Sequence, residues 1–359
     1  MDLSSAHSRN WMPARRAERT ARLLAVLLVL GLPLGLLLAR LISDRSSPVV
    51  EIHARMPHDG GFLPGEIQAV AGEPLRLRLV SDDVLHGFAV GQTDFPEIDL
   101  YPGQTVETTL VFDQPGRYTY VCTRWCGPDH WRMRGVIDVR PAAGETALPP
   151  AADPPLYLEL GLDLDAPHPA RVTPASRPAA VTGIELPGRY RSQDYLRAAS
   201  PAQVWEALRS DPVTHGMDDE QVWGLVAGLW QESTTPQRLE QGRELYARSC
   251  AACHGETGTG DGVFASQHAR DAERSDHAGA VEGHASPGGA VDGHAIEAPA
   301  DFTDPENMLG AAPALLHGKI VRGGMGTGMP YWGTVFSDDQ IWMLVEYLWT
   351  FQFDLEEGK

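Results

Sequence analysis

The sequence predicts a protein of three parts: a single N-terminal membrane helix, an all-β sandwich and an all-α domain. An uncharged apolar run lies near the N-terminus, period-2 alternation recurs over residues 49–140, and helical patterns take over from residue 201. The chain has 359 residues and is 43% hydrophobic, which is enough for two or three folded domains. Its net charge of −19 argues against a nucleic-acid partner.

The uncharged run Leu23–Ala39 extends past one arginine to Ile42, which gives about the 20 residues that a membrane-spanning helix needs. Five arginines lie within residues 1–22, so we expect these residues in the cytoplasm, a helix over 23–42 and the bulk outside. A cleaved signal peptide is the alternative, although no A-x-A site follows the run. Both interpretations place the rest of the chain on the extracytoplasmic side of the inner membrane.

Residues 49–140 predict a Greek-key β-sandwich. Short alternating runs are separated by turn signals such as "YPGQ" and "DQPGR". The runs are "VVEIHA", "LRLRLV", "TVETTLVF", "RYTYVC" and "GVIDV". This spacing suits a small domain of two packed sheets.

Residues 141–200 are rich in proline and alanine and predict a linker. Within it, "LYLELGLDL" carries a leucine at every second position from 156 to 164. In a strand these leucines would share one face, so we expect a strand over 156–164 that docks on the β domain.

Residues 201–235 and 236–353 have helical patterns. Thr235 and Pro236 are an N-cap and a first-turn proline, and Ser337 caps a last amphipathic helix. "DEQVWGLVAGLW" at 219–230 recurs as "DDQIWMLVEYLW" at 338–349. We interpret 201–235 as a haem-less remnant of a repeat, with chance similarity of two amphipathic helices as the alternative. Residues 265–297 are a low-complexity insert whose four histidines lack fixed ligand geometry.

The stretch "CTRWCGPDHWRM" gathers soft and borderline metal ligands. Together with His86 from an earlier strand, Cys126, His130 and Met133 make the His₂Cys-plus-methionine set of a blue-copper site. Cys122 is one thiolate more than that site needs. Two cysteines four residues apart can both bridge two metal ions, so the second thiol predicts a pair of coppers. A structural zinc site on the histidines and cysteines is the alternative, but it leaves Met133 unexplained.

"SDDVLHGF", "CTRWCGPDHWRM" and "GVIDV" resemble the copper A domain of subunit II of cytochrome c oxidase, a cupredoxin fold. The resemblance covers about residues 49–140. It implies that Cys122 and Cys126 bridge, that His86 and Met133 complete one copper site, and that His130 with the backbone carbonyl of Arg124 completes the other.

The sequence departs from this family at three points. Arg124 stands where the family commonly has a glutamate that also helps to hold magnesium, and an arginine cannot replace that ligand. The tryptophan-rich strand that usually precedes the first histidine is missing. One membrane helix is predicted, where most relatives have two.

"CAACH", residues 250–254, is the attachment motif of a covalent c-type haem, with Cys250 and Cys253 for the vinyl groups and His254 for the iron. Residues 236–353 resemble a small class I cytochrome c. The family's ligand methionine typically precedes a proline, so Met329 is the expected second axial ligand and Met325 the alternative.

These resemblances imply a membrane-anchored electron-transfer subunit like subunit II of caa3-type oxidases, with one haem c, a dinuclear copper A and no catalytic site of its own. Its expected partners are an external donor, either a c-type cytochrome or a cupredoxin, and a polytopic haem–copper subunit I. A nitric oxide reductase subunit and a free-standing shuttle are the alternatives. A copper-delivery protein has no use for "CAACH".

Overall fold

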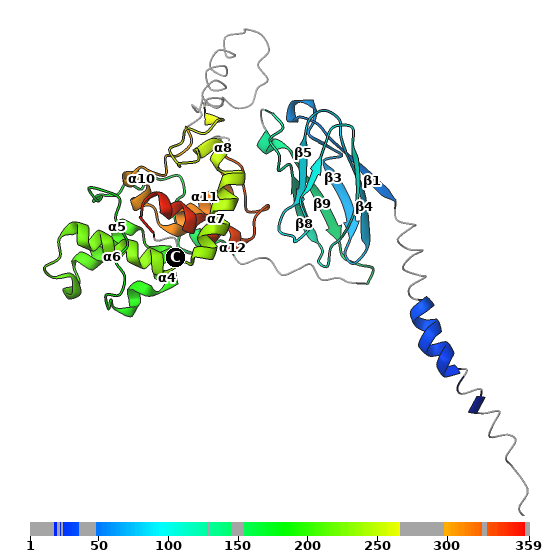
Figure 1. Cartoon of the computed structure of the whole chain (residues 1–359), viewed down its shortest axis with the longest axis horizontal. Helices are drawn as coiled ribbons and strands as arrows, with labels where there is room; N and C mark the ends of the chain where they lie inside the picture. Colours follow the sequence, from blue (N-terminus) through cyan, green and yellow to red (C-terminus); the bar gives the residue numbers. More distant parts are fainter. Residues whose placement is uncertain are drawn as a thin grey trace, which may run out of the picture.

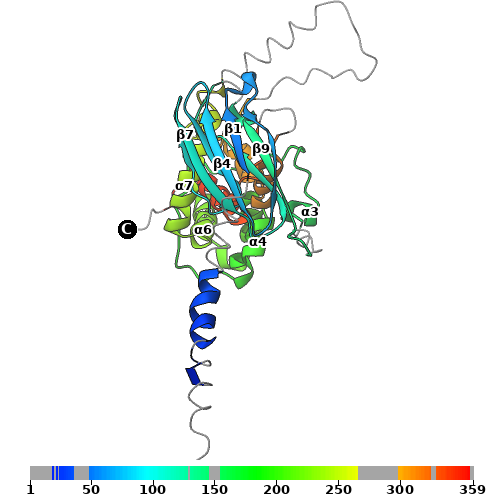
Figure 2. The same cartoon turned by 90° about the vertical axis from the view of Figure 1, so that its right-hand side faces the viewer.

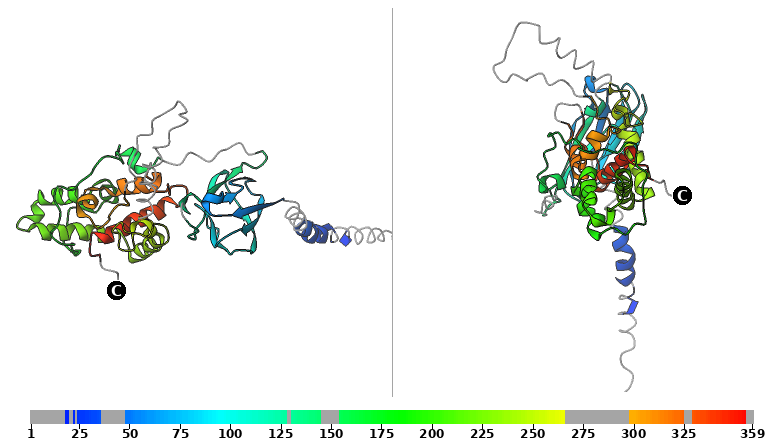
Figure 3. Two further views of the ribbon diagram at one scale, coloured as in Figure 1. Left: turned by 90° about the horizontal axis from the view of Figure 1, so that it is seen from above. Right: turned by 90° about the vertical axis from the view of Figure 1, so that its left-hand side faces the viewer.

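A β-sandwich and a helical region stand side by side in the computed structural model of the chain (Figures 1 and 3). The structure describes residues 18–19, 22, 24–35, 48–127, 130–144, 154–265, 298–324 and 329–355. Most of the predicted low-complexity insert, residues 266–297, lies outside this set, as does Met325.

The described part of the N-terminal apolar segment, residues 24–35, is helical and includes a π-helical turn η1 (Leu27–Gly31). Among the described residues, no helix has both the length and the apolar character to cross a membrane. Leu23 and residues 36–42 are outside the described set. The single membrane helix over 23–42 therefore stays a prediction.

The sandwich consists of a four-stranded sheet in the order β2-β1-β4-β7 and a five-stranded sheet in the order β3-β9-β8-β5-β6. Its strands are β1 (Val49–Ala54), β2 (Phe62–Leu63), β3 (Glu66–Val70), β4 (Pro74–Ser81), β5 (His86–Val90), β6 (Ile98–Leu100), β7 (Thr105–Val111), β8 (Gly116–Val121) and β9 (Arg134–Arg140). Each alternating run in the sequence forms a strand, which confirms the predicted β-sandwich.

Alternation along the strands builds the core of the sandwich. In β4, Leu75, Leu77 and Leu79 are buried while the residues between them face outward. Two parallel pairings, β1 with β4 and β3 with β9, tie the first strands into the two sheets. In Figure 2 the sandwich stands in front of the helical region, with the strands running roughly along its length.

The helical region shares one hydrophobic core that extends from Leu164 to Leu355. Its helices are α3 (Leu156–Glu159), α4 (Gln193–Ala198), α5 (Pro201–Arg209), α6 (Asp219–Glu232), α7 (Pro236–Ser249), α8 (Ala251–His254), α10 (Pro305–Gly310), α11 (Pro313–Arg322) and α12 (Asp338–Leu348). The similar segments of the repeat are α6 and α12, and Trp230 packs edge-on against its counterpart Trp349 at 5.7 Å between ring centroids. Residues 201–235 are thus helical, as predicted; their origin as a remnant stays a prediction.

The predicted strand over 156–164 is wrong. Residues 156–159 form the short helix α3, and the chain turns at Gly161, which has a positive φ of 64°. Leu158 and Leu160 are exposed, so there is no shared leucine face. Leu164 instead joins the helical core, and α3 packs on α11. The segment therefore docks on the helical region and not on the β-sandwich.

The sandwich contacts the helical region through residues just after β5 and at the start of β9. The backbone N–H of Gln92 donates to the carbonyl of Val335 at 3.0 Å, and the Gln92 side chain donates to Gly333 O at 2.6 Å. The Arg134 guanidinium lies 4.3 Å from the ring centroid of Tyr331. These contacts place the segment after Met329 against the sandwich.

Candidate metal and cofactor sites

Five predicted copper ligands converge at one end of the sandwich. His86 begins β5, Cys122 follows β8, Cys126 lies on the next loop, His130 begins a 3₁₀ turn, and Met133 directly precedes β9. His86, both cysteines and Met133 are buried, whereas His130 is half-buried. The strands thus bring the first histidine to a loop that carries the other four ligands.

The ligand atoms lie within coordination range of a shared centre. Cys122 Sγ is 3.9 Å from Cys126 Sγ and 3.8 Å from His86 Nδ1. Cys126 Sγ is 3.3 Å from His130 Nδ1 and 3.5 Å from Met133 Sδ. The two sulfurs are too far apart for a disulfide, yet half their separation is shorter than a metal–thiolate bond of about 2.3 Å. A metal ion can therefore bond to both, and the donor set fits copper.

The two thiols share a hydrogen bond and do not titrate independently. The hydrogen bond from Cys126 is the largest cause that lowers the pKa of Cys122, and burial opposes it. His130 and His86 lower the pKa of Cys122 further. The pKa of Cys126 is raised, first by Cys122 and then by burial. These opposite directions favour a thiolate at Cys122 beside a thiol at Cys126, and a metal bound to both sulfurs would displace the remaining proton.

Asp83 orients His86. Its Oδ1 lies 2.6 Å from His86 Nε2, and the N–H groups of Met56 and Val84 donate to the same carboxylate. Burial opposes ionisation of Asp83, but these hydrogen bonds outweigh it and lower the pKa of the carboxyl. The Asp83 carboxylate thus holds the Nε2 side of the ring and leaves Nδ1 facing the sulfurs. Sequence reasoning missed this residue, although it stands three positions before the histidine.

Arg124 contributes to the site with its backbone and is held by two acids through its side chain. Its carbonyl oxygen lies 3.1 Å from Cys122 Sγ. The guanidinium pairs with Glu97, and its Nε lies 2.9 Å from Asp99 Oδ1 without good hydrogen-bond geometry. The arginine charge thus lies beside these two carboxylates.

The haem motif lies where α7 passes into α8. Cys250 is the C-cap of α7, and α8 carries Cys253 and His254. Both cysteines are free and half-buried. His254 Nδ1 lies 3.1 Å from the carbonyl of Ala300, which leaves Nε2 for an iron atom. The donor types and this tautomer fit a covalently attached haem.

Met329 packs half-buried against the helical core, and its carbonyl accepts from Gly324 N at 3.2 Å. The alternative ligand Met325 is outside the described residues, so the choice between the two stays a prediction. In the described part of the chain, His86, Cys122 and Cys126 are the one group of three or more His, Cys or acidic residues close enough to share a metal ion.

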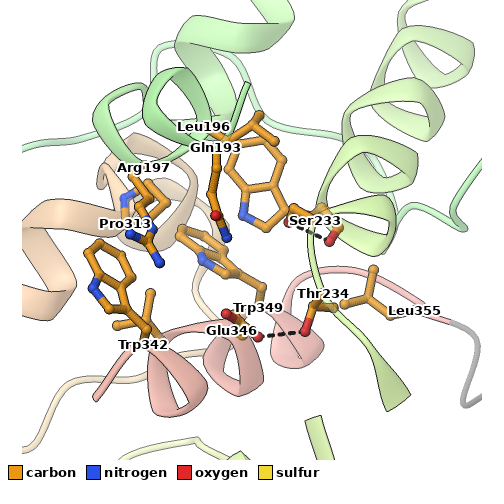
Figure 4. Close-up of a pocket in the computed structure, with 12 residues that line it drawn as sticks. Gln193, Leu196, Arg197, Ser233, Thr234, Pro313, Trp342, Glu346, Trp349 and Leu355 are labelled. Atoms are coloured by element: carbon orange, nitrogen blue, oxygen red, sulfur yellow. Dashed lines mark hydrogen bonds between the residues drawn. The ribbon is translucent and has the colours of Figure 1, made fainter. Parts of the chain in front are cut away.

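A small cavity of about 40 Å³ lies between α4, α6 and α12 (Figure 4). Its wall includes Trp230, Trp342, Trp349 and Arg197, whose guanidinium covers the Trp342 ring at 3.9 Å. None of the copper or haem ligands lines it. This cavity is therefore a gap between packed helices of the helical region, separate from the candidate copper and haem ligands.

Comparisons with known proteins match the two sites separately. Residues 66–140 match the family described as "Cytochrome C oxidase subunit II, periplasmic domain". Residues 237–348 match "Cytochrome C oxidase, cbb3-type, subunit III". Cytochrome c oxidase subunit 2 of Thermus thermophilus is 32% identical over 80 residues, which are 22% of this chain and 58% of the relative. A second Thermus thermophilus protein of the same description is also 32% identical, with 47% of its length covered. The chain thus spans about half the length of these relatives.

Two solved structures are also similar. A cryo-EM structure of a heme-copper terminal oxidase dimer contains a chain that is 26% identical to this one, with a TM-score of 0.24. The match covers 34% of this chain and 99% of that chain. The periplasmic domain of subunit II of cytochrome oxidase of Bradyrhizobium japonicum is 20% identical, with a TM-score of 0.23. That match covers 25% of this chain and 82% of the solved chain. From the family matches, the chain joins a copper-binding region like that of oxidase subunit II to a c-type cytochrome region.

Proposed function

We propose that this chain is the electron-input subunit of a membrane terminal oxidase. It would take electrons from an external c-type cytochrome or cupredoxin at a haem c, pass them to a dinuclear copper A, and deliver them to a polytopic haem–copper subunit I. The observation that carries the proposal is the pair of buried sulfurs 3.9 Å apart, with separate flanking ligands for two metal ions.

The residues divide into two ligand sets. Cys122 and Cys126 would bridge, with His86 and Met133 completing one copper site and His130 and the Arg124 carbonyl the other. The buried Met133 favours copper over zinc, because its Sδ lies 3.5 Å from a bridging sulfur and zinc sites seldom use thioether ligands. Copper and haem bound there would each accept and donate one electron.

The protein's own residues keep both sites closed. The proposed copper ligands would leave no position for substrate, and all of them but His130 and Arg124 are buried. In the cytochrome region, His254 and Met329 would hold the iron on both faces. Closed sites suit electron transfer, whereas catalytic metal sites keep an open position. We therefore propose that the chain itself reduces no substrate.

The same ligand chemistry would serve a subunit of a nitric oxide reductase or a free-standing membrane-anchored shuttle, because the acceptor site lies on another protein in both cases. The match of residues 66–140 to an oxidase subunit favours the oxidase. The expected location is the inner membrane, with the N-terminus in the cytoplasm and both cofactor regions outside.

Metal content and electron paramagnetic resonance test the proposal. The chain produced with haem-attachment machinery should contain two coppers and one covalent haem, and the oxidised copper should give a delocalised mixed-valence signal. Cys122→Ser should lose that signal, because one bridging sulfur is gone. Arg132→Gln, on the same loop but outside both ligand sets, should keep it. One copper, or zinc, in the native chain would overturn the dinuclear proposal.

A further inference from the structure

The copper loop and the haem motif meet through a pair of aromatic rings. Trp125, which lies between the two copper-site cysteines, stacks on Phe264 with ring centroids 3.6 Å apart and planes 22° from parallel. Trp125 belongs to the sandwich and Phe264 to the helical region. The contact is therefore a bridge between the parts of the protein that carry the two cofactor sites.

Phe264 is attached to the haem motif by short-range hydrogen bonds. Its N–H donates to the carbonyl of Ala252 at 2.9 Å, and the N–H of Gly262 donates to the carbonyl of Cys253 at 3.1 Å. A Cβ at Gly262 would collide with Ala252 O, so only glycine lets this loop lie directly on the motif. The Phe264 ring is thus held next to the residues that would carry the haem.

Trp125 is equally close to the copper ligands. It is bonded through the chain to Cys126, and its ring centroid lies 5.6 Å from that of His130. A continuous series of packed groups therefore leads from Cys253 through Phe264 and Trp125 to a bridging sulfur and a histidine ligand.

Polar contacts also join the two parts of the protein that carry the rings. Arg248, in the last turn of α7, lies 3.8 Å from Glu97, the same acid that pairs with Arg124 of the copper loop. The Gln92 side chain donates to Gly333, and its backbone N–H donates to Val335. The stack is therefore not the sole contact that holds the sandwich against the helical region.

We propose that the Trp125–Phe264 stack is the bridge across which electrons pass from haem c to the copper pair. The inference rests on the proposed function. The transfer moves one electron: the ferrous haem iron is oxidised to ferric, the oxidised copper pair is reduced by one electron, and no proton or bond changes. The physical reason is that electron tunnelling decays more slowly through packed atoms than across a solvent-filled gap.

The test uses the full chain loaded with copper and haem, in which a light pulse reduces the haem and its reoxidation by copper is followed by absorbance. Trp125→Leu and Phe264→Leu should each slow this step by at least an order of magnitude. Trp125→Phe should restore most of the rate, because it restores a stacking ring. Gln241→Asn, on the exposed side of α7 and outside both the stack and the polar contacts, should leave the rate within a factor of two of the native value.

Two further measurements separate a bridge from a structural contact. The copper resonance signal, haem spectrum and both reduction potentials should be unchanged in the leucine variants. In denaturant unfolding, the loss of stability in the double variant should differ from the sum of the losses in the two single variants, because the two rings touch. A native-like transfer rate in Trp125→Leu would overturn the bridge while leaving the proposed function intact. A native chain with both cofactors but no haem-to-copper transfer would overturn the proposed function itself.

Discussion

One carboxylate determines which nitrogen of His86 faces the copper ligands. Asp83 Oδ1 lies 2.6 Å from Nε2, and three donors keep this acid ionised. The preceding residue along the chain, Asp82, points elsewhere: it pairs with His53 and Arg55. Two adjacent acids thus have different roles, and only one of them touches a ligand.

Asp83→Asn should therefore weaken copper binding by roughly 10–100-fold, the usual cost of losing an outer-shell partner of a ligating histidine. Asp82→Asn, one residue away and without contact to His86, should bind copper like the native chain. Competition with a chelator of known affinity measures both. Equal affinity in the two variants would show that Asp83 does not orient the ligand.

The second axial ligand of the proposed haem is either Met329 or Met325. Met329→Ala should abolish the sulfur-to-iron absorption band of the oxidised protein and lower the reduction potential, since methionine ligation raises it. Met325→Ala should keep the band, because Met329 rather than Met325 precedes a proline. Visible spectroscopy and redox titration of both variants decide this, and the reverse pattern would move the assignment to Met325.

At the scale of elements, α7 and α12 cross at closest approach where Gly242 faces Met343 and Tyr347. A Cβ at position 242 would collide with the backbone carbonyl of Met343. Thr235 caps α7, and Ser337 caps α12 through a reciprocal capping box. The helix that precedes the haem motif is therefore fixed at its start and at its crossing point.

Gly242→Ala should destabilise the protein by about 1–3 kcal/mol, because overpacking outweighs the gain in helix propensity. Gln241→Ala, on the exposed side of the same turn, should change the free energy of unfolding by less than about 0.5 kcal/mol. Denaturant unfolding of the haem-loaded chain compares the two. An unchanged free energy of unfolding in Gly242→Ala would mean that α7 and α12 can move apart without loss of stability.

A buried histidine in the helical region makes stability depend on pH. His317 is 1% exposed, stacks on Trp342 at 4.3 Å, and has no well-directed hydrogen bond on either ring nitrogen. Burial is the main cause that lowers its pKa, and Arg197 adds to it; Asp338, 3.0 Å from Nε2, opposes both. The folded state therefore favours the neutral ring.

The unfolded chain binds a proton at this histidine near pH 6.5, before the folded chain does, so stability falls as the pH drops below that value. The loss due to His317 should approach about 1.4 kcal/mol per pH unit. His317→Phe keeps a ring against Trp342 and removes the titration, so its stability should fall less between pH 7.5 and 5.5. If the free energy of unfolding changed equally with pH in the native protein and in His317→Phe, the buried His317 would not be neutral in the folded state.

Local patterns predicted the elements well, and interactions between distant segments explain what they missed. Every alternating run of the β-sandwich became a strand, and α7 begins at Pro236 after the predicted N-cap Thr235. The leucine run at 156–164 failed, because its alternation competes with two prolines before it and Gly161 inside it, which favour a short helix and a turn. Its burial depends on α11, which lies far along the sequence.

The sequence indicates candidate ligands for each site, but it gives no sign of how the two sites are arranged in space. The copper loop and "CAACH" are compact motifs whose chemistry is readable from residue types and spacing. The contact between Trp125 and Phe264, by contrast, joins segments separated by the whole of the intervening linker and helices. No local pattern in either segment indicates the other, so the bridge needed the folded structure.

The proposed function requires a catalytic partner for this chain. Among the described residues, His86, Cys122 and Cys126 are the one group of His, Cys or acidic residues that could share a metal ion. In the proposed function this copper site would be closed to substrate, and the predicted membrane segment 23–42 contains no histidine. Reduction of oxygen or nitric oxide requires a metal with an open position, so under the proposed function a second subunit would supply that metal. We expect the chain to co-purify, from membranes in mild detergent, with a polytopic haem-bearing protein. The isolated chain should accept electrons from a small reductant yet consume neither gas in electrode measurements. Consumption of either gas by the chain alone would contradict the oxidase proposal. Migration of the chain from native membranes as a lone monomer would contradict it too, and would favour a free-standing shuttle.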